Sequence, residues 1–107
     1  MSQEEIITKV KEAVEEDPNK DYIQSISLFG SYLYGNKRPD SDVDLLFEMR
    51  KTMSLFQIGG MQYRLERKLG RKVDFVEKDS VIPQLKDKII PGARKIYRNY
   101  STSLKRL

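Results

Sequence analysis

Short runs of apolar and β-branched residues alternate along this chain with longer segments in which apolar residues recur every three or four positions. The runs at 22–29, 42–49 and 72–77 predict strands. The segments at 3–16 and 54–69 predict helices, each with one apolar face. A chain of 107 residues provides enough core for one domain. We therefore expect a single domain, residues 1–107, that combines helices and strands.

Local signals mark the ends of both predicted helices. Ser2 and Glu5 have the spacing of a capping box, in which each side chain bonds to the backbone of the other residue. Pro18 follows the expected end of the first helix near position 16. Gly70 lies just past the expected end of the second helix, where a glycine often stops a helix.

The C-terminal part is less regular. Ser80 is expected to cap a short helix that has Pro83 in its first turn and ends near position 89. Residues 93–97 fit either an edge strand or a resumed helix. Residues 99–107 are polar and predict a frayed tail, which leaves a core of about residues 23–97.

The composition excludes several kinds of chemistry. The chain has no Cys and no His, so disulfides, thiolate nucleophiles, Cys/His zinc sites and serine–histidine triads are all excluded. No apolar run approaches the roughly 18 residues that span a bilayer. The first residues, MSQEEIITKV, are acidic where a secretion signal is basic. We expect no membrane partner and a cytoplasmic location.

Charge is divided unevenly along the chain, whose net charge is +4. Residues 1–49 carry 11 acids and 5 bases, whereas residues 50–107 carry 5 acids and 15 bases. The basic residues of the second half form either an ordinary solvated surface or a surface that attracts a polyanion, such as nucleotide phosphates, RNA or an acidic protein. The bases form no single run and no aromatic RNA-binding motif accompanies them, so direct nucleic-acid binding is not supported.

Carboxylates begin the second predicted strand. Asp42 and Asp44 are two residues apart, so their side chains share a face, with Cα atoms roughly 6.6 Å apart. Two like charges on a half-buried face repel unless a cation lies between them. Asp74, in the third predicted strand, can supply a third carboxylate. A site with oxygen ligands alone favours Mg²⁺, with Mn²⁺ as the alternative. Carboxylates two residues apart on a strand can reach two such ions about 3.5–4 Å apart.

Gly30 and Ser31 follow the first predicted strand. At a strand-to-helix junction, their backbone amides and the Ser31 hydroxyl can bind phosphate oxygens, and Gly30 has no Cβ to obstruct them. A phosphate cradle, two metal ligands and a third acid together describe phosphoryl or nucleotidyl transfer.

Three other interpretations of the same stretch fit less well. Gly30 and Gly35 have the glycine spacing of a P-loop, but the Lys and the Ser or Thr that should follow are out of place. Alternating acids that end at Asp44 resemble the start of a calcium loop, but Leu45 stands where glycine is required. A structural interpretation treats the glycines as turn residues and Asp42 as solvated. It leaves Asp44 unexplained within an apolar strand.

The whole arrangement resembles the minimal nucleotidyltransferase (MNT) proteins of the polymerase-beta-like nucleotidyltransferase superfamily. Their signature is a Gly-Ser after the first strand, a second Gly, then Ser-Asp-x-Asp-Leu, and a later Asp in the third strand. The resemblance covers about residues 23–97, and its elements here are Gly30-Ser31, Gly35, Ser41-Asp42-Val43-Asp44-Leu45 and Asp74. It implies an α+β fold of two layers, a mixed β-sheet backed by helices.

The resemblance also implies a role for each site residue. Gly30 and Ser31 would hold the phosphates of the nucleotide, and Asp42 and Asp44 would bind two Mg²⁺ ions. Asp74 would help to hold the catalytic metal or accept the proton of the attacking hydroxyl. The acceptor oxygen would attack the α-phosphate of ATP, and pyrophosphate would leave.

Larger relatives carry a second, helical domain that shapes the acceptor site, and this sequence of 107 residues does not include one. MNT proteins resemble antitoxins that pair with HEPN-type ribonuclease toxins. The expected function is therefore that of an antitoxin enzyme, a Mg²⁺-dependent protein adenylyltransferase. It would transfer AMP from ATP to a tyrosine of such a toxin and form a hetero-oligomer with it. Two alternatives stay open: a binding-only antitoxin or nucleotide sensor without turnover, and the catalytic subunit of a two-chain enzyme that modifies RNA or a small molecule.

Overall fold

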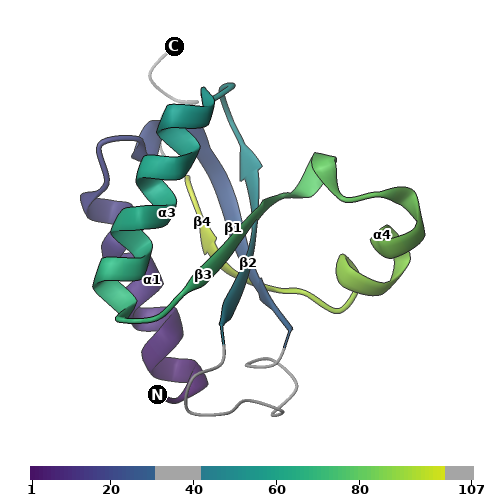
Figure 1. Cartoon of the computed structure of the whole chain (residues 1–107), viewed down its shortest axis with the longest axis horizontal. Coiled ribbons are helices and arrows are strands. Elements are labelled where there is room, and N and C mark those ends of the chain that lie inside the picture. The colour runs from purple at the N-terminus through teal and green to yellow at the C-terminus, as the bar shows by residue number, and fades with distance from the viewer. Residues whose placement is uncertain (31–41, 101–107) are drawn as a thin grey trace.

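The computed structural model describes residues 1–30 and 42–100 (Figure 1). Within these two ranges, no helix is both long enough and apolar enough to cross a membrane. The predicted strands and the two long predicted helices are confirmed to within one residue at each end. In chain order the elements are α1 (Gln3–Glu16), the 3₁₀ turn η1 (Lys20–Tyr22), β1 (Ile23–Phe29), β2 (Val43–Met49), α3 (Leu55–Leu69), β3 (Val73–Glu77), the 3₁₀ turn η2 (Lys78–Ser80), α4 (Pro83–Ile89) and β4 (Arg94–Arg98).

The four strands form one sheet in the order β3-β2-β1-β4. β2 pairs in parallel with β3, whereas β1 pairs antiparallel with both β2 and β4. α1 and α3 pack together on one face of the sheet, and α4 stands on the other side (Figure 1). The expected α+β fold, a mixed sheet backed by helices, is confirmed. β4 (Arg94–Arg98) also shows that this segment forms an edge strand, beginning at residue 94, and not a resumed helix.

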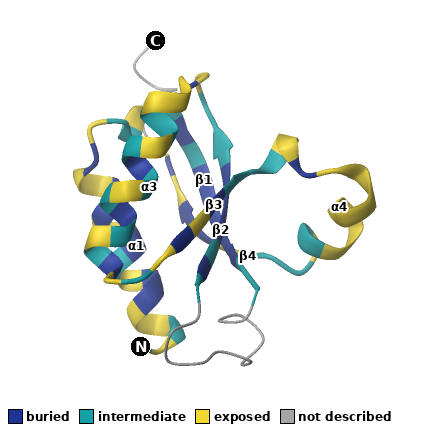
Figure 2. Ribbon diagram, in the orientation of Figure 1, coloured by how far each residue is buried: buried dark blue, intermediate teal, exposed yellow. Residues whose placement is uncertain are grey.

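The core lies between the sheet and these two helices (Figure 2). Because alternate residues of a strand share a face, the odd-numbered residues of β2 fill this core. The even-numbered ones, Asp44, Leu46 and Glu48, point the other way; we call the face that they share the open face. The largest side chains that are fully buried are those of Phe47, Ile6, Ile23, Ile26, Leu28, Leu45, Met61 and Leu65.

Both long helices begin with a capping box, as predicted at Ser2. The Ser2 hydroxyl accepts from the Glu5 amide at 3.1 Å, and the Ser2 amide donates to the Glu5 carboxylate at 3.0 Å. Ser54 and Gln57 make the same pair of bonds at the start of α3, at 3.1 and 2.8 Å. Gly70 ends α3 with φ +67°, the left-handed conformation that glycine adopts readily.

A buried ion pair joins the end of α1 to α3. Asp17 is the C-cap of α1, and its side chain is only 2% exposed. Its carboxylate accepts hydrogen bonds from Arg64 Nε at 2.7 Å and Nη2 at 3.1 Å, and from the Asn19 amide at 2.8 Å. The bond to Asp17 raises the pKa of the Arg64 guanidinium. The buried carboxylate is thus satisfied by three donors.

Two expectations for the C-terminal part were wrong. Ser80 does not cap α4: it lies in η2, its hydroxyl donates to Glu77 Oε1 at 2.8 Å, and Ile82 takes the N-cap position. Asn99, expected in a frayed tail, is 4% exposed, and its side chain donates to the Ile23 carbonyl at 3.1 Å. Asn99 satisfies a backbone group at the start of β1, so the ordered fold includes it.

Candidate active site

The end of β1 and the start of β2 meet at Gly30 and Asp44. Gly30 has φ +78°, and a Cβ built there would lie 1.9 Å from Asp44 Oδ2 and 2.8 Å from Asp44 Cγ. Phe29, the last residue of β1, is the antiparallel partner of Asp44. The Asp44 carboxylate therefore lies directly against the backbone of Gly30, in space that any side chain at position 30 would take.

The structure brings Asp44 and Asp74 together. They are register partners in the parallel pair of β2 and β3. Partners in adjacent strands point to the same face, so both carboxylates lie on the open face. Asp42 immediately precedes β2 and is half-buried, two residues before Asp44 and on the same side by strand alternation. Asp74 thus stands beside Asp44 and not across the sheet from it.

α3 holds the beginning of β3, and with it Asp74. The Glu66 carboxylate accepts from the Val73 amide at 3.0 Å, and the Gln62 side chain donates to the Val73 carbonyl at 2.8 Å. Both backbone polar groups of Val73, the residue before Asp74, are therefore hydrogen-bonded to side chains of α3. Gln62 and Glu66 are positioning residues, and their polar positions on an amphipathic helix gave no sign of this role in the sequence.

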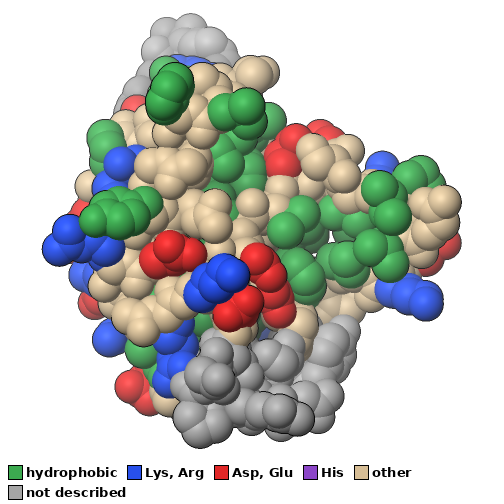
Figure 3. Space-filling model, in the orientation of Figure 1, with side chains coloured by type: hydrophobic (Ala, Val, Ile, Leu, Met, Phe, Trp, Pro, Cys, Tyr) green, Lys and Arg blue, Asp and Glu red, His purple; other side chains and the backbone are tan. Residues whose placement is uncertain are grey.

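The donor set fits a hard divalent cation, because every side chain that it offers is a carboxylate. Within residues 1–30 and 42–100, however, no group of three or more acidic side chains is already arranged to hold a metal ion. Figure 3 shows acidic side chains gathered next to the grey, undescribed residues, with a hydrophobic area beside them that continues onto α4. Ser31, Gly35 and Ser41 lie outside the described residues.

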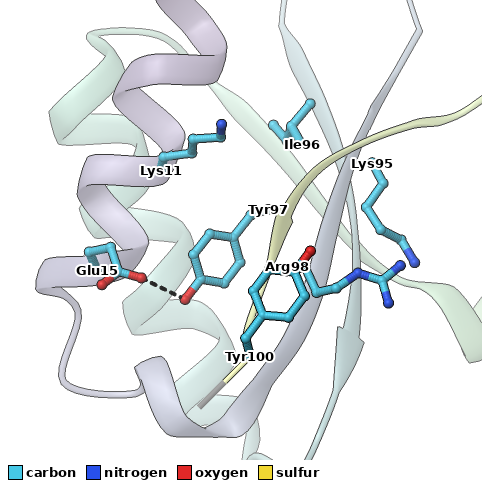
Figure 4. A pocket seen from close by; sticks show the side chains of 7 residues that line it. All are labelled: Lys11, Glu15, Lys95, Ile96, Tyr97, Arg98 and Tyr100. Carbon is cyan, nitrogen blue, oxygen red and sulfur yellow. Dashed lines mark hydrogen bonds between the residues drawn. The ribbon is translucent and has the colours of Figure 1, made fainter.

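A hollow of about 510 Å³ lies away from the candidate acids, between α1 and β4. In it the Tyr97 hydroxyl donates to Glu15 Oε2 at 2.9 Å (Figure 4). None of the candidate acids lines this hollow, so it is separate from the candidate site. Its lining residues are Lys11, Glu15, Lys95, Ile96, Tyr97, Arg98 and Tyr100.

Two curated relatives are similar in sequence to part of this chain. MJ0435 of Methanocaldococcus jannaschii, named as an inferred protein adenylyltransferase, is 37% identical over 71 residues, which are 66% of this chain and 76% of the relative. The protein adenylyltransferase MntA of Thermococcus cleftensis is 39% identical over 59 residues, 55% of this chain and 60% of the relative.

Two solved structures share the fold. A crystal structure of a toxin–antitoxin with AMP-PNP matches with a TM-score of 0.73 at 22% identity, over 88% of this chain and 74% of that one. A structure of the tri-AMPylated Shewanella oneidensis HEPN toxin in complex with MNT antitoxin matches with a TM-score of 0.66 at 20% identity, over 91% of this chain and 73% of that one.

The nucleotidyltransferase domain family matches residues 7–97, a span that runs from the middle of α1 to β4. This span includes Gly30 and all three candidate acids. The match agrees with the mixed sheet, with the paired carboxylates beside a glycine corner and with the fold of both solved structures. The chain belongs to the nucleotidyltransferase domain family.

Proposed function

We propose that this chain is a protein adenylyltransferase that acts as an antitoxin in the cytoplasm. It transfers AMP from ATP to a tyrosine hydroxyl of a partner HEPN-type ribonuclease toxin. The observation that carries the proposal is the pairing of Asp44 with Asp74 on the open face, with Asp44 seated against Gly30. The names of its relatives and the toxin–antitoxin structures that share its fold support the choice of acceptor.

The nucleotide binds at the corner between β1 and β2. Gly30 lets the Asp44 carboxylate lie against the backbone at this corner, and Ser31 would offer a hydroxyl and an amide to the phosphate oxygens. Asp42, Asp44 and Asp74 would hold Mg²⁺, which when bound neutralises charge on the phosphates and on the leaving group. Asp44 and Asp74 are register partners on one face of the parallel pair, so a cation bound there would be within reach of both carboxylates.

The reaction forms one bond and breaks one. The tyrosine oxygen attacks the α-phosphorus of ATP, and the bond from this phosphorus to the oxygen that bridges to the β-phosphate breaks. Pyrophosphate leaves with that electron pair, and the tyrosine retains AMP as a phosphodiester. Asp74, the more exposed of the paired acids, would either help to hold the metal or accept the hydroxyl proton. Gln62 and Glu66 keep Asp74 in place through the backbone of Val73.

Intact mass tests this function directly. The chain is incubated with the purified product of its neighbouring gene, ATP and Mg²⁺, and that product is then weighed. We expect its mass to rise by one or more adenylyl groups. An Asp42→Asn/Asp44→Asn variant should add none. A Glu16→Gln/Asp21→Asn variant, which removes two exposed acids outside the site, should add as many as the unsubstituted chain.

Each contrary result favours a specific alternative. Full neutralisation of the toxin by a variant that lacks all three acids would favour a binding-only antitoxin. Preferential labelling of RNA or of an aminoglycoside would favour a two-chain nucleotidyltransferase. Equal transfer by the Asp42→Asn/Asp44→Asn variant would place the active site elsewhere.

A further inference from the structure

Lys72, the residue just before β3, has a backbone that is held from two directions. Its carbonyl accepts a hydrogen bond from the Val43 amide of β2 at 2.9 Å. The amide of the same peptide group, that of Val73, donates to the Glu66 carboxylate of α3 at 3.0 Å. Both polar ends of this peptide group are therefore bonded, one to the sheet and one to a helix, and the fold fixes the point from which the Lys72 side chain extends.

The Lys72 side chain extends on the open face. Val73 is buried in the core, and side chains alternate between the two faces along an extended chain. Lys72 and Asp74 therefore share the other face, with Cα atoms about 6.6 Å apart. Lys72 is exposed. It brings a positive charge to the edge of the sheet where Asp44 and Asp74 are paired.

The Lys72 ammonium is not used in an ion pair. Within residues 1–30 and 42–100 it pairs with no carboxylate, although Asp74 shares its face. Two other lysines of the open face differ in this respect, because Lys78 and Lys95 lie 3.5 and 3.8 Å from the Glu48 carboxylate. The charge of Lys72 is therefore available to a negatively charged group that arrives at this edge.

Lys72 and Gly30 lie on opposite sides of Asp44. In the sheet, β2 lies between β1 and β3. Phe29, just before Gly30, is the register partner of Asp44. Asp44 is in turn the partner of Asp74 on β3. Because adjacent strands are about 4.8 Å apart, the corner at Gly30 and the strand that follows Lys72 are about 10 Å apart, with Asp44 between them.

The geometry of the reaction gives these two sides different roles. The attacking and leaving oxygens lie roughly in line, on opposite sides of the phosphorus. The proposed function places the phosphates of ATP at the corner of Gly30, so pyrophosphate leaves on the side of β1. The acceptor hydroxyl then approaches from the side of β3, where Asp74 and Lys72 lie.

Negative charge that develops on the side of β3 needs a cation. As the tyrosine hydroxyl loses its proton, its oxygen becomes negative beside Asp74, and the two like charges repel. A hydrogen-bond donor that is already in place where charge develops contributes strongly to catalysis. Lys72 carries a positively charged donor on the same face as Asp74 and two residues from it.

We propose that Lys72 is a catalytic residue that binds the acceptor oxygen. Its ammonium donates a hydrogen bond to the tyrosine oxygen as this oxygen attacks the α-phosphorus and pyrophosphate leaves. The hydroxyl proton passes to Asp74 or to water, and Lys72 keeps its own protons. The inference rests on the proposed function, because it assigns a residue to the acceptor side of the same site.

Steady-state transfer at saturating ATP and Mg²⁺ tests this role, with the purified product of the neighbouring gene as the acceptor. Lys72→Met should lower kcat at least about tenfold. Loss of a donor from a closed site costs about 100-fold or more, and Lys72 is exposed to water. Lys72→Arg keeps the charge and should recover most of the loss. The Kd of Lys72→Met for ATP with Mg²⁺, measured by calorimetry without the acceptor, should not change.

A more acidic acceptor separates a chemical role of Lys72 from a structural one. Fluorotyrosine, incorporated into the acceptor protein, loses its hydroxyl proton more easily than tyrosine does. The loss of kcat in Lys72→Met should therefore be smaller with the fluorinated acceptor, because its oxygen needs less stabilisation. A variant that is merely misfolded would lose the same factor with both acceptors.

Two exposed lysines outside the site provide matched controls. Lys11→Met on α1 and Lys86→Met on α4 each remove one positive charge from the surface. Both should retain the kcat of the unsubstituted chain. The melting temperatures of these two variants and of Lys72→Met should agree with that of the unsubstituted chain, because all three side chains are exposed.

Several results would overturn the inference. An unchanged kcat in Lys72→Met, or an equal loss with both acceptors, would remove Lys72 from the acceptor oxygen. A raised Kd for ATP would assign its ammonium to the nucleotide. Equal losses in the two control variants would show a general effect of net charge. Each of these results leaves the proposed function intact as long as the unsubstituted chain transfers AMP. Absence of that transfer would remove the proposed function, and the role of Lys72 with it.

Discussion

The Asp44 carboxylate occupies the space that a side chain at Gly30 would need. A Cβ at Gly30 would lie 1.9 Å from Asp44 Oδ2, far inside van der Waals contact, and the φ of +78° is itself unfavourable for any residue with a Cβ. Two separate constraints therefore require glycine here. They act where the proposed nucleotide site and the first pair of strands meet.

Substitution Gly30→Ala should damage both stability and transfer. The positive φ costs about 1–2 kcal/mol for a residue with a Cβ. The clash also forces the Asp44 carboxylate away from its position. A displacement of about 1 Å at a catalytic group lowers rates about 100-fold, and we expect at least this loss of AMP transfer. Urea unfolding and initial transfer rates measure the two effects.

Gly70→Ala is the matched control for this substitution. Gly70 has φ +67°, but a Cβ there would meet nothing within 4 Å. The variant should lose about 1–2 kcal/mol of stability from the same backbone strain and keep its transfer rate. Full activity of Gly30→Ala, or equal loss of activity in Gly70→Ala, would contradict the role given to the contact with Asp44.

The facing pair of Asp44 and Asp74 predicts a response to metal. These two carboxylates share one face of the sheet, and a cation that binds them in the folded chain but not in the unfolded chain should stabilise the fold. At a free Mg²⁺ concentration 100 times its Kd, the gain in unfolding free energy is about 2.7 kcal/mol. Thermal unfolding with and without Mg²⁺, at matched ionic strength, measures the shift.

Variants of Asp44 and Asp74 provide the controls for the Mg²⁺ experiment. An Asp44→Asn/Asp74→Asn variant should unfold at the same temperature with and without Mg²⁺. Asp21→Asn, at an exposed acid outside the site, should retain the full Mg²⁺ shift. A shift of equal size in the double variant would mean that Mg²⁺ binds elsewhere.

Features that depend on neighbours in sequence could be predicted. The capping box of Ser2 and Glu5 and the stop at Gly70 each involve residues within one helical turn, so the sequence contains the whole interaction. The shared face of Asp42 and Asp44 likewise follows from the two-residue period of a strand. The pairing of Asp74 with Asp44 required the family resemblance, because strand order is not a local property.

Features that depend on distant residues could not be predicted. Arg64 bonds to Asp17 across 47 positions, and Gln62 reaches the backbone of Val73 only once α3 has packed beside β3. Leu55 lies in the apolar three-and-four periodicity of the predicted helix 54–69. It is 86% exposed, because the inward row of this helix begins further along, with Met61 fully buried. No pattern in the sequence indicates that α4 stands away from the sheet.

Arg64→Ala should destabilise the chain through the charge that it leaves behind. Asp17 would keep a buried carboxylate with one donor, the Asn19 amide, in place of three. Removal of one partner of a fully buried pair costs about 3–5 kcal/mol, but Arg64 is 40% exposed and water can replace it, so we expect a smaller loss of about 1–3 kcal/mol. Chemical denaturation at neutral pH measures it.

Two further variants separate charge from packing. Arg67→Ala removes an exposed arginine from the same helix and should change stability by less than about 0.5 kcal/mol. Asp17→Asn/Arg64→Met removes both charges and should recover part of the loss, since no unpaired ion remains. A double variant no more stable than Arg64→Ala would show that the side-chain packing of Arg64, and not the charge of Asp17, explains the effect.

Tyr97 predicts how stability changes in alkaline solution. Burial and then the hydrogen bond to Glu15 raise the pKa of the Tyr97 hydroxyl well above its usual value. The folded state therefore keeps this proton at a pH where the unfolded chain loses it. The contribution of the hydroxyl to the stability of the fold is complete below about pH 10 and declines as the pH rises further.

The variant Tyr97→Phe has no hydroxyl to titrate, and it loses about 1 kcal/mol of stability at neutral pH because the hydrogen bond to Glu15 is absent. In urea unfolding, its stability deficit should stay constant from about pH 7 to 9 and shrink above about pH 10. A deficit that stays constant up to about pH 11 would mean that the hydroxyl ionises as easily in the folded chain as in the unfolded one.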